Sequence, residues 1–441
     1  MDEDTLKGEL AEQYIAELCS NAYMKDFCFR NPQLDGRELC DFLIILGEHA
    51  IIWQIKNLKL SDGKLKQKEV DKAIRQCHGA KRKLLAHQAV TFSNISNEKK
   101  SIDISRIKEV HLIAAIEGGI PNMHTDNQNG DKSRVHVFFS DTTKFALKYL
   151  NTVADLVEYL GNRSLLASKL SAQMILIGSE KDLMAEYLTN ARTFGDLEQP
   201  NKADLIVLEY ENAADKFESK QGVLERLEQD AIYGSLWDHL IDKQRAGIVY
   251  EDASPDITQE DRDTTLSTMM SHTALEKRML GGAFLDAAQS ALKAHKDSSA
   301  ESRTSFRRYC PMAGVTYAFW FFEGSWKEDI KLRQSILYFI SIAARVKFPD
   351  NHTVIGIATE IDMLEKSDCG YDWIHLIVDD DEKLLEELNE PATKEVLQKL
   401  GILTNPTMRT TQMSEYPNEE NLTSNGPIYK GRIEVPKKRD E

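Results

Sequence analysis

Two apolar runs joined by a short polar link constrain the fold of this chain more than any other feature. The runs are LCDFLIIL over residues 39–46 and AIIWQIK over residues 50–56, and Gly47-Glu48-His49 separates them. Such a density of β-branched and aromatic residues favours strands, and so short a link is typical of neighbouring antiparallel strands. We therefore predict a buried β-hairpin over residues 39–56.

The hairpin lies in the first of several expected parts. We expect residues 1–161 to form an α/β (α+β) domain with a mixed central sheet flanked by helices, because apolar residues recur there at helical spacing or in strand-like runs. Besides the hairpin, its predicted elements are helices over residues 5–24, 66–87 and 142–161 and strands over residues 109–116 and 134–139.

Three further parts follow in the sequence. Residues 162–300 have mainly helical spacing, and residues 301–403 combine strand-like and helical runs as a smaller C-terminal α+β module. Residues 404–441 are rich in Pro, Asn, Thr and charge, so we expect a flexible tail. Aromatic residues crowd the strand-like run 314–322, where a role in the core is expected rather than stacking on nucleic-acid bases.

Composition excludes several classes of protein. With 41% hydrophobic and 29% charged residues the chain has ordinary globular usage, which excludes global disorder. No apolar run approaches the roughly 18–20 residues of a membrane span, and the acidic N-terminus lacks the apolar core of a signal peptide. Six scattered cysteines without a CxxC pair, and no glycine-rich phosphate motif, predict a cytoplasmic protein with reduced thiols and no nucleotide cofactor in this chain.

Charge is distributed unevenly along the chain. The formal net charge is −16, yet residues 59–83 carry nine basic residues against three acidic ones. This local excess suits a phosphate-facing edge or, alternatively, a solvated helix face. The acidic remainder suits neither a membrane nor nucleic acid, so we expect it to mediate homo-oligomerisation or contact with a partner protein.

Three polar residues interrupt the apolar hairpin. Asp41 lies near the start of the first strand, and Gln54 and Lys56 lie near the end of the second. Side chains alternate with period two, so Gln54 and Lys56 share a face, and antiparallel pairing brings Asp41 roughly opposite Gln54. Polar groups in such apolar strands are costly unless they are solvated, paired or bound to metal.

The order of helix, ELCD, IWQIK and a second helix resembles the PD-(D/E)XK nuclease superfamily, with its restriction-endonuclease-like fold. The resemblance covers residues 5–90 and implies a leading acid at Glu12, with Glu9 as second choice, a central Asp at Asp41, and a QxK variant of the catalytic triple at Gln54-Ile55-Lys56. It also implies a functional glutamine, Gln76, on the helix after the hairpin.

The resemblance implies a Mg²⁺ or Mn²⁺ site held by Glu12, Asp41, Gln54 and the backbone carbonyl of Ile55. Lys56 would orient or deprotonate the attacking water. The phosphates of bound DNA would meet Lys72, Arg75 and Lys81. Two residues depart from the family pattern: Cys40 stands where a proline is usual, and Gln54 replaces a carboxylate, which lowers the expected affinity for a hard cation.

The expected function is therefore metal-dependent hydrolysis of DNA phosphodiester bonds. By analogy of architecture alone, anti-phage defence or restriction would be its setting. The main alternative is a catalytically silent nuclease-like scaffold or nucleic-acid sensor whose C-terminal half binds a protein partner. A third alternative is a nuclease that acts on RNA.

Overall fold

The computed structural model divides into two compact units. Unit 1 comprises Met1–Leu224 with Met270–Ala274 and Glu419–Pro427, and unit 2 comprises Glu225–Met269, Leu275–Asn418 and Ile428–Glu441. The helices of residues 162–300 are thus shared between the two units. The structure describes residues 10, 12–19, 23, 25–58, 67–117, 124–125, 134–169, 173–194, 205–247, 259–297, 305–312, 314–323, 329–366, 369–377, 386, 390–399, 407–413 and 429–435.

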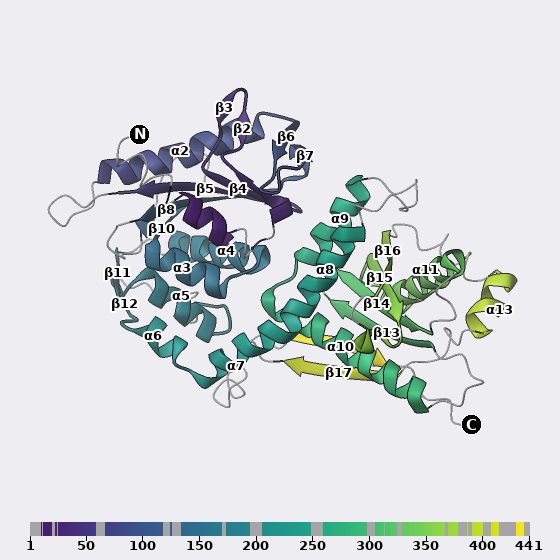
Figure 1. Cartoon of the computed structure of the whole chain (residues 1–441). Coiled ribbons are helices and arrows are strands. Elements are labelled where there is room, and N and C mark those ends of the chain that lie inside the picture. The colour runs from purple at the N-terminus through teal and green to yellow at the C-terminus, as the bar shows by residue number, and fades with distance from the viewer. Residues whose placement is uncertain are drawn as a thin grey trace. The chain divides into compact units, whose positions relative to one another are not determined.

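Unit 1 is built around a six-stranded mixed sheet with strand order β1-β4-β5-β8-β10-β9 (Figure 1). Strands β1, β4 and β5 are antiparallel, whereas β5, β8 and β10 run parallel, and β9 pairs antiparallel at the edge. The strands are β1 (Cys28–Arg30), β4 (Phe42–Leu46), β5 (His49–Asn57), β8 (Glu109–Glu117), β9 (His124–Thr125) and β10 (Val135–Phe139).

The predicted hairpin is confirmed as β4 and β5. Their pairing runs from Phe42 opposite Trp53 to Leu46 opposite His49, which leaves two residues in the connection. The first of these, Gly47, has a φ of 58°. A positive φ at the first position of a two-residue link matches the type II′ turn that the twist of a hairpin favours.

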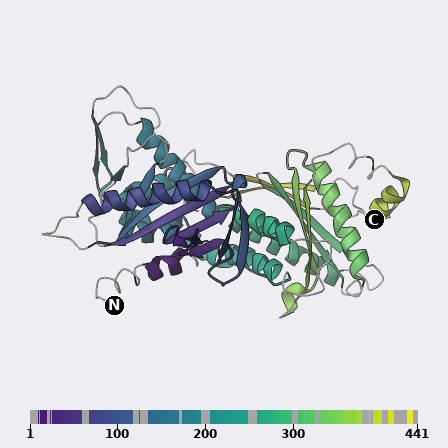
Figure 2. The same ribbon diagram turned by 90° about the horizontal axis from the view of Figure 1, so that it is seen from above.

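The central strands of this sheet are buried on both faces (Figures 1 and 2). Helix α2 (Gln67–Leu85) covers one face with the apolar stripe that includes Val70 and Ile74. On the opposite face lie α3 (Ser140–Tyr149) and α4 (Val153–Lys169). There Phe138 packs against Tyr159 of α4, with ring centroids 6.5 Å apart. The near-continuous apolar runs of these strands follow from this double cover.

The single helix predicted over residues 142–161 is wrong: the structure has two helices, α3 and α4. Leu150 leaves the helical region, with φ −113° and ψ 54°. Thr152 then begins the next helix, because its hydroxyl accepts the backbone N–H of Asp155 at 3.0 Å. A polar cap thus divides an apolar pattern that continues across the junction.

Residues 12–19 are helical, as predicted within residues 5–24, but the buried stripe is shifted by about one residue. The buried side chains are Ile15, Ala16 and Cys19. Leu10 and Tyr14, which the same helical spacing predicts on the apolar face, are exposed. The fold therefore buries one of two neighbouring apolar stripes of this helix.

Smaller elements complete unit 1. Asp35 and Gly36 both have positive φ, 53° and 71°, as a type I′ turn requires, and they connect the short strands β2 and β3. A second hairpin, β6–β7, was not predicted from the sequence. The bounds are η1 (Lys25–Phe27), β2 (Gln33–Leu34), β3 (Arg37–Glu38), β6 (Ala89–Ser93), β7 (Lys99–Asp103), η2 (Ile104–Arg106), β11 (Gln173–Ile177), α5 (Glu180–Thr189), β12 (Leu205–Glu209), α6 (Ala213–Glu218) and α7 (Gln221–Gln229), of which the part from Glu225 onward belongs to unit 2.

Unit 2 holds a second six-stranded sheet with strand order β16-β15-β14-β13-β18-β17. Strands β14 and β15 are parallel, with α11 as their crossover helix, and the other neighbours are antiparallel. Its elements are η4 (Asp230–Gly234), α8 (Ser235–Gly247), α9 (Gln259–Met270), α10 (Ala274–Asp297), β13 (Ser305–Met312), β14 (Val315–Phe322), α11 (Ile330–Lys347), β15 (Thr353–Glu360), η6 (Met363–Glu365), β16 (Tyr371–Ile377), α13 (Pro391–Lys399), β17 (Thr407–Met413) and β18 (Tyr429–Val435).

The aromatic run over residues 314–322 is buried core, as predicted. On one face of β14, Trp320 belongs to the cluster beneath α11. On the other face, Tyr317 meets Trp237 of α8 with ring centroids 4.8 Å apart, and Phe319 meets Phe284 of α10 at 5.1 Å. These rings therefore form the packed core between the sheet and its helices.

Strands β17 and β18 lie in the stretch for which the sequence predicted a tail. They pair with each other, and β18 also pairs with β13 where Tyr309 lies opposite Glu434. Backbone pairing of this kind needs little apolar periodicity, so the sequence pattern carried no signal for it.

Among the described residues, no helix is both long and apolar enough to cross a membrane.

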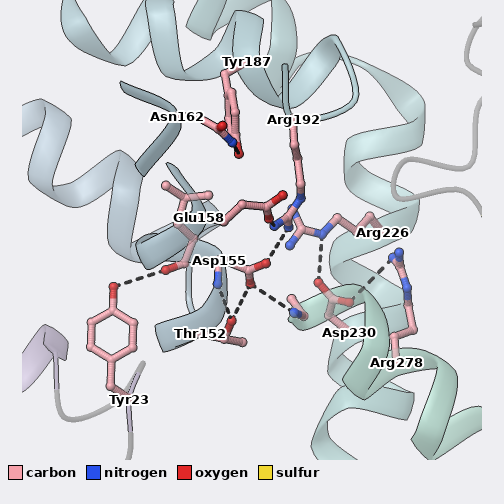
Figure 3. A network of polar contacts seen from close by, with 12 residues as sticks. Tyr23, Thr152, Asp155, Glu158, Asn162, Tyr187, Arg192, Arg226, Asp230 and Arg278 are labelled. Carbon is pink, nitrogen blue, oxygen red and sulfur yellow. Dashed lines mark hydrogen bonds and ion pairs between the residues drawn. The ribbon is translucent and has the colours of Figure 1, made fainter. Parts of the chain in front are cut away.

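A π-helical turn, η4, sets a close contact inside unit 2. The Asp230 carboxylate lies 3.1 Å from Arg226 Nε and 3.6 Å from Arg278 Nη1, and both arginines are buried (Figure 3). In the same turn the carbonyl of Tyr233 approaches Gly281 of α10 so closely that an added Cβ would lie 1.9 Å from its oxygen. Only glycine permits this approach.

We predict that Gly281→Ala lowers the free energy of unfolding of unit 2 by about 2–3 kcal/mol, because the methyl group displaces the η4 backbone. Gly282→Ala is the matched control: its nearest neighbours would be ring carbons of Tyr233 at 3.9 Å. That variant should gain up to about 1 kcal/mol from helix propensity. Urea unfolding followed by circular dichroism measures both, and equal effects of the two substitutions would contradict the contact.

Candidate active site

Asp41 is fixed by the edge of the hairpin. It directly precedes β4, and its Oδ2 accepts the backbone N–H of Ile55 at 2.5 Å. Its own carbonyl accepts the N–H of Asn31 at 3.0 Å. The Asp41 carboxylate thus accepts the hydrogen bond that a backbone carbonyl would accept if β4 were longer, and this bond holds it in one orientation. Asp41 is only 5% exposed.

Lys56 and Gln54 share the face of Asp41. The Lys56 ammonium lies 3.5 Å from Asp41 Oδ2, and 24% of the lysine side chain is exposed. Gln54 is 4% exposed and, by the register of β4 and β5, stands opposite Asp41. All three lie on the face of the sheet that α2 covers. Cys77 of α2 is close enough to feel the Asp41 charge: the pKa of its thiol is raised, mainly by burial and then by that charge. The sequence-based grouping of these three residues is therefore realised in the fold.

Glu38 and Glu12 add negative charge beside Asp41. The carboxyl group of Glu38, at the end of β3, hydrogen-bonds that of Asp41. The pKa of Glu38 is raised, first by burial and then by the Asp41 and Glu12 charges, while Lys56 acts in the opposite direction. Glu38 was not predicted as a site residue. Its position three residues before Asp41 in GRELCD was the available signal.

The remaining predicted residues are distributed differently. Gln76, Lys72 and Arg75 are exposed on α2, and Lys81 is partly buried. Ile55 is buried and contributes its N–H to Asp41. Glu9, the second choice for the leading acid, and the basic residues Lys59, Lys64 and Lys66 lie outside the described residues.

A second polar cluster occupies the opposite end of the same strands. His49 opens β5, and Glu109 and His111 open β8. Glu109 Oε2 lies 3.6 Å from His49 Nδ1 and 3.4 Å from His111 Nε2. The pKa of His111 is lowered to about 4, mainly by burial and then by the neighbouring His49, so its ring is neutral at pH 7. The sequence analysis missed this cluster; the spacing Glu-x-His on a strand was its signal.

Buried ion pairs elsewhere in unit 1 are structural. Asp155 accepts the Thr152 hydroxyl at 2.7 Å and lies 2.5 Å from Arg192 Nη2 (Figure 3). Glu180 receives two bonds from Arg163, at 2.6 and 3.0 Å, and both side chains are fully enclosed. Because these carboxylates are paired with arginines and fully buried, we assign them a structural role.

Comparisons of the chain with protein-family models, with curated proteins and with solved structures found no match.

We predict that Asp41→Ala lowers the stability of unit 1 by about 1–3 kcal/mol more than Asp41→Asn, because only alanine leaves the buried Ile55 N–H without an acceptor. Urea unfolding without divalent cations measures the difference. Asp141→Ala, which removes an exposed carboxylate in the first turn of α3, is the control and should cost less than about 1 kcal/mol. Equal stability of the two Asp41 variants would show that the hydrogen bond is not significant.

Proposed function

We propose that unit 1 is a metal-dependent nuclease that hydrolyses phosphodiester bonds in DNA, with a restriction-endonuclease-like arrangement of its sheet. One observation carries the proposal: Asp41 and Lys56 lie 3.5 Å apart at one end of the central hairpin, with the Glu38 carboxyl group against Asp41. A lysine beside a carboxylate cluster that opens to solvent is the pattern expected for hydrolysis of a phosphate ester.

The strand topology supports the proposal. A helical segment precedes an antiparallel β1-β4-β5 meander, and α2 then leads to β8, which runs parallel to β5. This order agrees with the order of motifs in the resemblance to PD-(D/E)XK nucleases. It places Asp41 and the Gln54-Ile55-Lys56 triple at the same end of two adjacent strands.

The donor set fits a hard divalent cation. Glu38 and Asp41 are carboxylates in direct contact, and their mutual repulsion contributes to the raised pKa of Glu38. A cation between them would relieve this repulsion, and oxygen ligands are those that Mg²⁺ and Mn²⁺ prefer. Glu38 would supply the negative charge that Gln54 lacks in a QxK triple. Glu12, close enough to influence Glu38 electrostatically, would complete the set.

Lys56 has the position for a direct chemical role. Bound at this site, the metal would polarise the phosphate and lower the pKa of a water molecule. The Lys56 ammonium, held by Asp41 and partly exposed, would orient the attacking water and offset the charge that develops on the phosphate oxygens. Asp41 in turn is held by Ile55, so lysine and carboxylate keep a fixed spacing on the hairpin.

Exposed basic residues on α2 favour a polyanionic substrate. Lys68, Lys72 and Arg75 lie exposed on the helix that covers the same face of the sheet as Lys56. Contacts of this kind add affinity without sequence preference and weaken as salt rises. The exposed positions on α2 therefore suit the flanks of a nucleic-acid strand whose scissile phosphate lies at Lys56.

The test is cleavage of supercoiled plasmid, linear duplex, single-stranded DNA and RNA by the full chain in Mg²⁺, in Mn²⁺ and in EDTA. We expect metal-dependent cutting of DNA, a loss of about 10²–10³-fold in rate for Lys56→Ala, and a comparable or larger loss for Asp41→Asn. Glu38→Gln should raise the Mg²⁺ concentration needed for half-maximal rate.

Lys99→Ala is the matched control, because Lys99 is an exposed lysine on β7 of the same unit and should leave the rate unchanged. Cutting that survives both Lys56→Ala and Asp41→Asn would overturn the assignment of the site. Binding of nucleic acid without turnover under any condition, equal in wild type and variants, would instead support the silent scaffold. Cleavage of RNA alone would redirect the substrate assignment.

A further inference from the structure

The cluster of His49, Glu109 and His111 is assembled by strand register. β5 and β8 are parallel, with His49 opposite Glu109 and Ile51 opposite His111. Side chains at positions two apart share a face, so the three polar side chains project from one face at the start of both strands. The carbonyl of Glu48 accepts the N–H groups of Lys108 at 2.8 Å and of Glu109 at 3.1 Å. These two hydrogen bonds hold the start of β8 beside the turn before His49.

The spacing of the three ligand atoms suits coordination of one metal ion. His49 Nδ1, His111 Nε2 and a Glu109 oxygen all lie within 4.8 Å of one another. The two nitrogens lie 3.6 and 3.4 Å from Glu109 Oε2. In a tetrahedral zinc site, bonds of 2.0–2.2 Å separate neighbouring ligand atoms by about 3.3–3.6 Å.

The two nitrogens also lack other partners. His49 Nδ1 and His111 Nε2 are each buried as atoms, and apart from Glu109 neither has a hydrogen-bond partner among the described residues. A buried ring nitrogen without a partner is costly, and coordination of a cation would satisfy both nitrogens together. The remainder of the cluster is open: 37% of the His49 side chain and 59% of the Glu109 side chain are exposed, so an ion can enter from solvent.

We propose that His49, Glu109 and His111 form a zinc site. Two imidazole nitrogens and one carboxylate favour zinc over Mg²⁺ or Ca²⁺, which select oxygen ligands. Three protein ligands leave a fourth position for water or for a group supplied from solvent. His111, the most enclosed ligand, would fix the ion against the sheet, and Glu109 would close the site from the exposed side.

The zinc site is separate from the proposed nuclease site. His49 and Lys56 lie at opposite ends of β5, about 23 Å apart at roughly 3.3 Å per residue. They also point to opposite faces of the sheet, since their positions differ by an odd number. Substitution at one cluster should therefore leave the other intact.

The test is zinc binding by the full chain after removal of metal with a chelator and dialysis. Isothermal titration calorimetry should give one high-affinity Zn²⁺ per chain, and Co²⁺ should give the visible absorption of a four-coordinate site. We expect His111→Ala and Glu109→Gln each to weaken Zn²⁺ binding by about 100-fold or more, because loss of a group that only hydrogen-bonds a metal ligand already costs about 10–100-fold. Circular dichroism establishes that each variant is folded.

His87→Ala is the matched control. His87 lies 3.3 Å from Asp35 as a simple His–Asp pair in the same unit, so zinc affinity should not change. Asp41→Asn should also retain zinc, which separates this inference from the proposed nuclease activity. Failure of the wild type to bind zinc, or equal zinc affinity in wild type, His111→Ala and Glu109→Gln, would overturn the proposal.

Discussion

Burial of β5 and β8 on both faces is the constraint on which the rest of unit 1 depends. Helix α2 covers one face and α3 with α4 the other, so polar side chains in the middle of these strands would lose their water without gaining partners. Polar groups are therefore confined to the strand ends, where solvent or a bound ion can reach them. Both candidate sites follow from this: Asp41 with Lys56 at one end, and His49 with Glu109 and His111 at the other.

Asp41 connects the fold to the proposed chemistry. Its carboxylate completes the hydrogen bonding of Ile55 and at the same time faces Lys56 and Glu38. The same atoms thus hold the hairpin edge and form the cluster that a cation would neutralise. This double role preorganises the site, since the oxygen that orients Lys56 is already held by a main-chain donor.

Much of the fold could be predicted because its strands and helices have strong local patterns. The hairpin over residues 39–56, the helix after it and the strand over 109–116 all formed close to their expected bounds. Several strands escaped prediction. Among them, β6, β7 and β13 are short or lack a distinctive apolar pattern, β11 and β12 lie in the stretch predicted as mainly helical, and β18 joins its sheet through backbone pairing. Thr152 shows a further limit, since one capping hydroxyl divided a helix whose apolar periodicity continued unchanged.

The sequence by itself determined the grouping of Asp41, Gln54 and Lys56, because a short link between antiparallel strands and a period of two fix which side chains meet on a hairpin. Only the tertiary structure brought Glu38 against Asp41 and His49 against Glu109 and His111. The first contact depends on how the β2–β3 hairpin folds back, and the second on the register between two parallel strands about sixty residues apart. The second contact joins segments far apart in the chain, and no local pattern specifies the register between them.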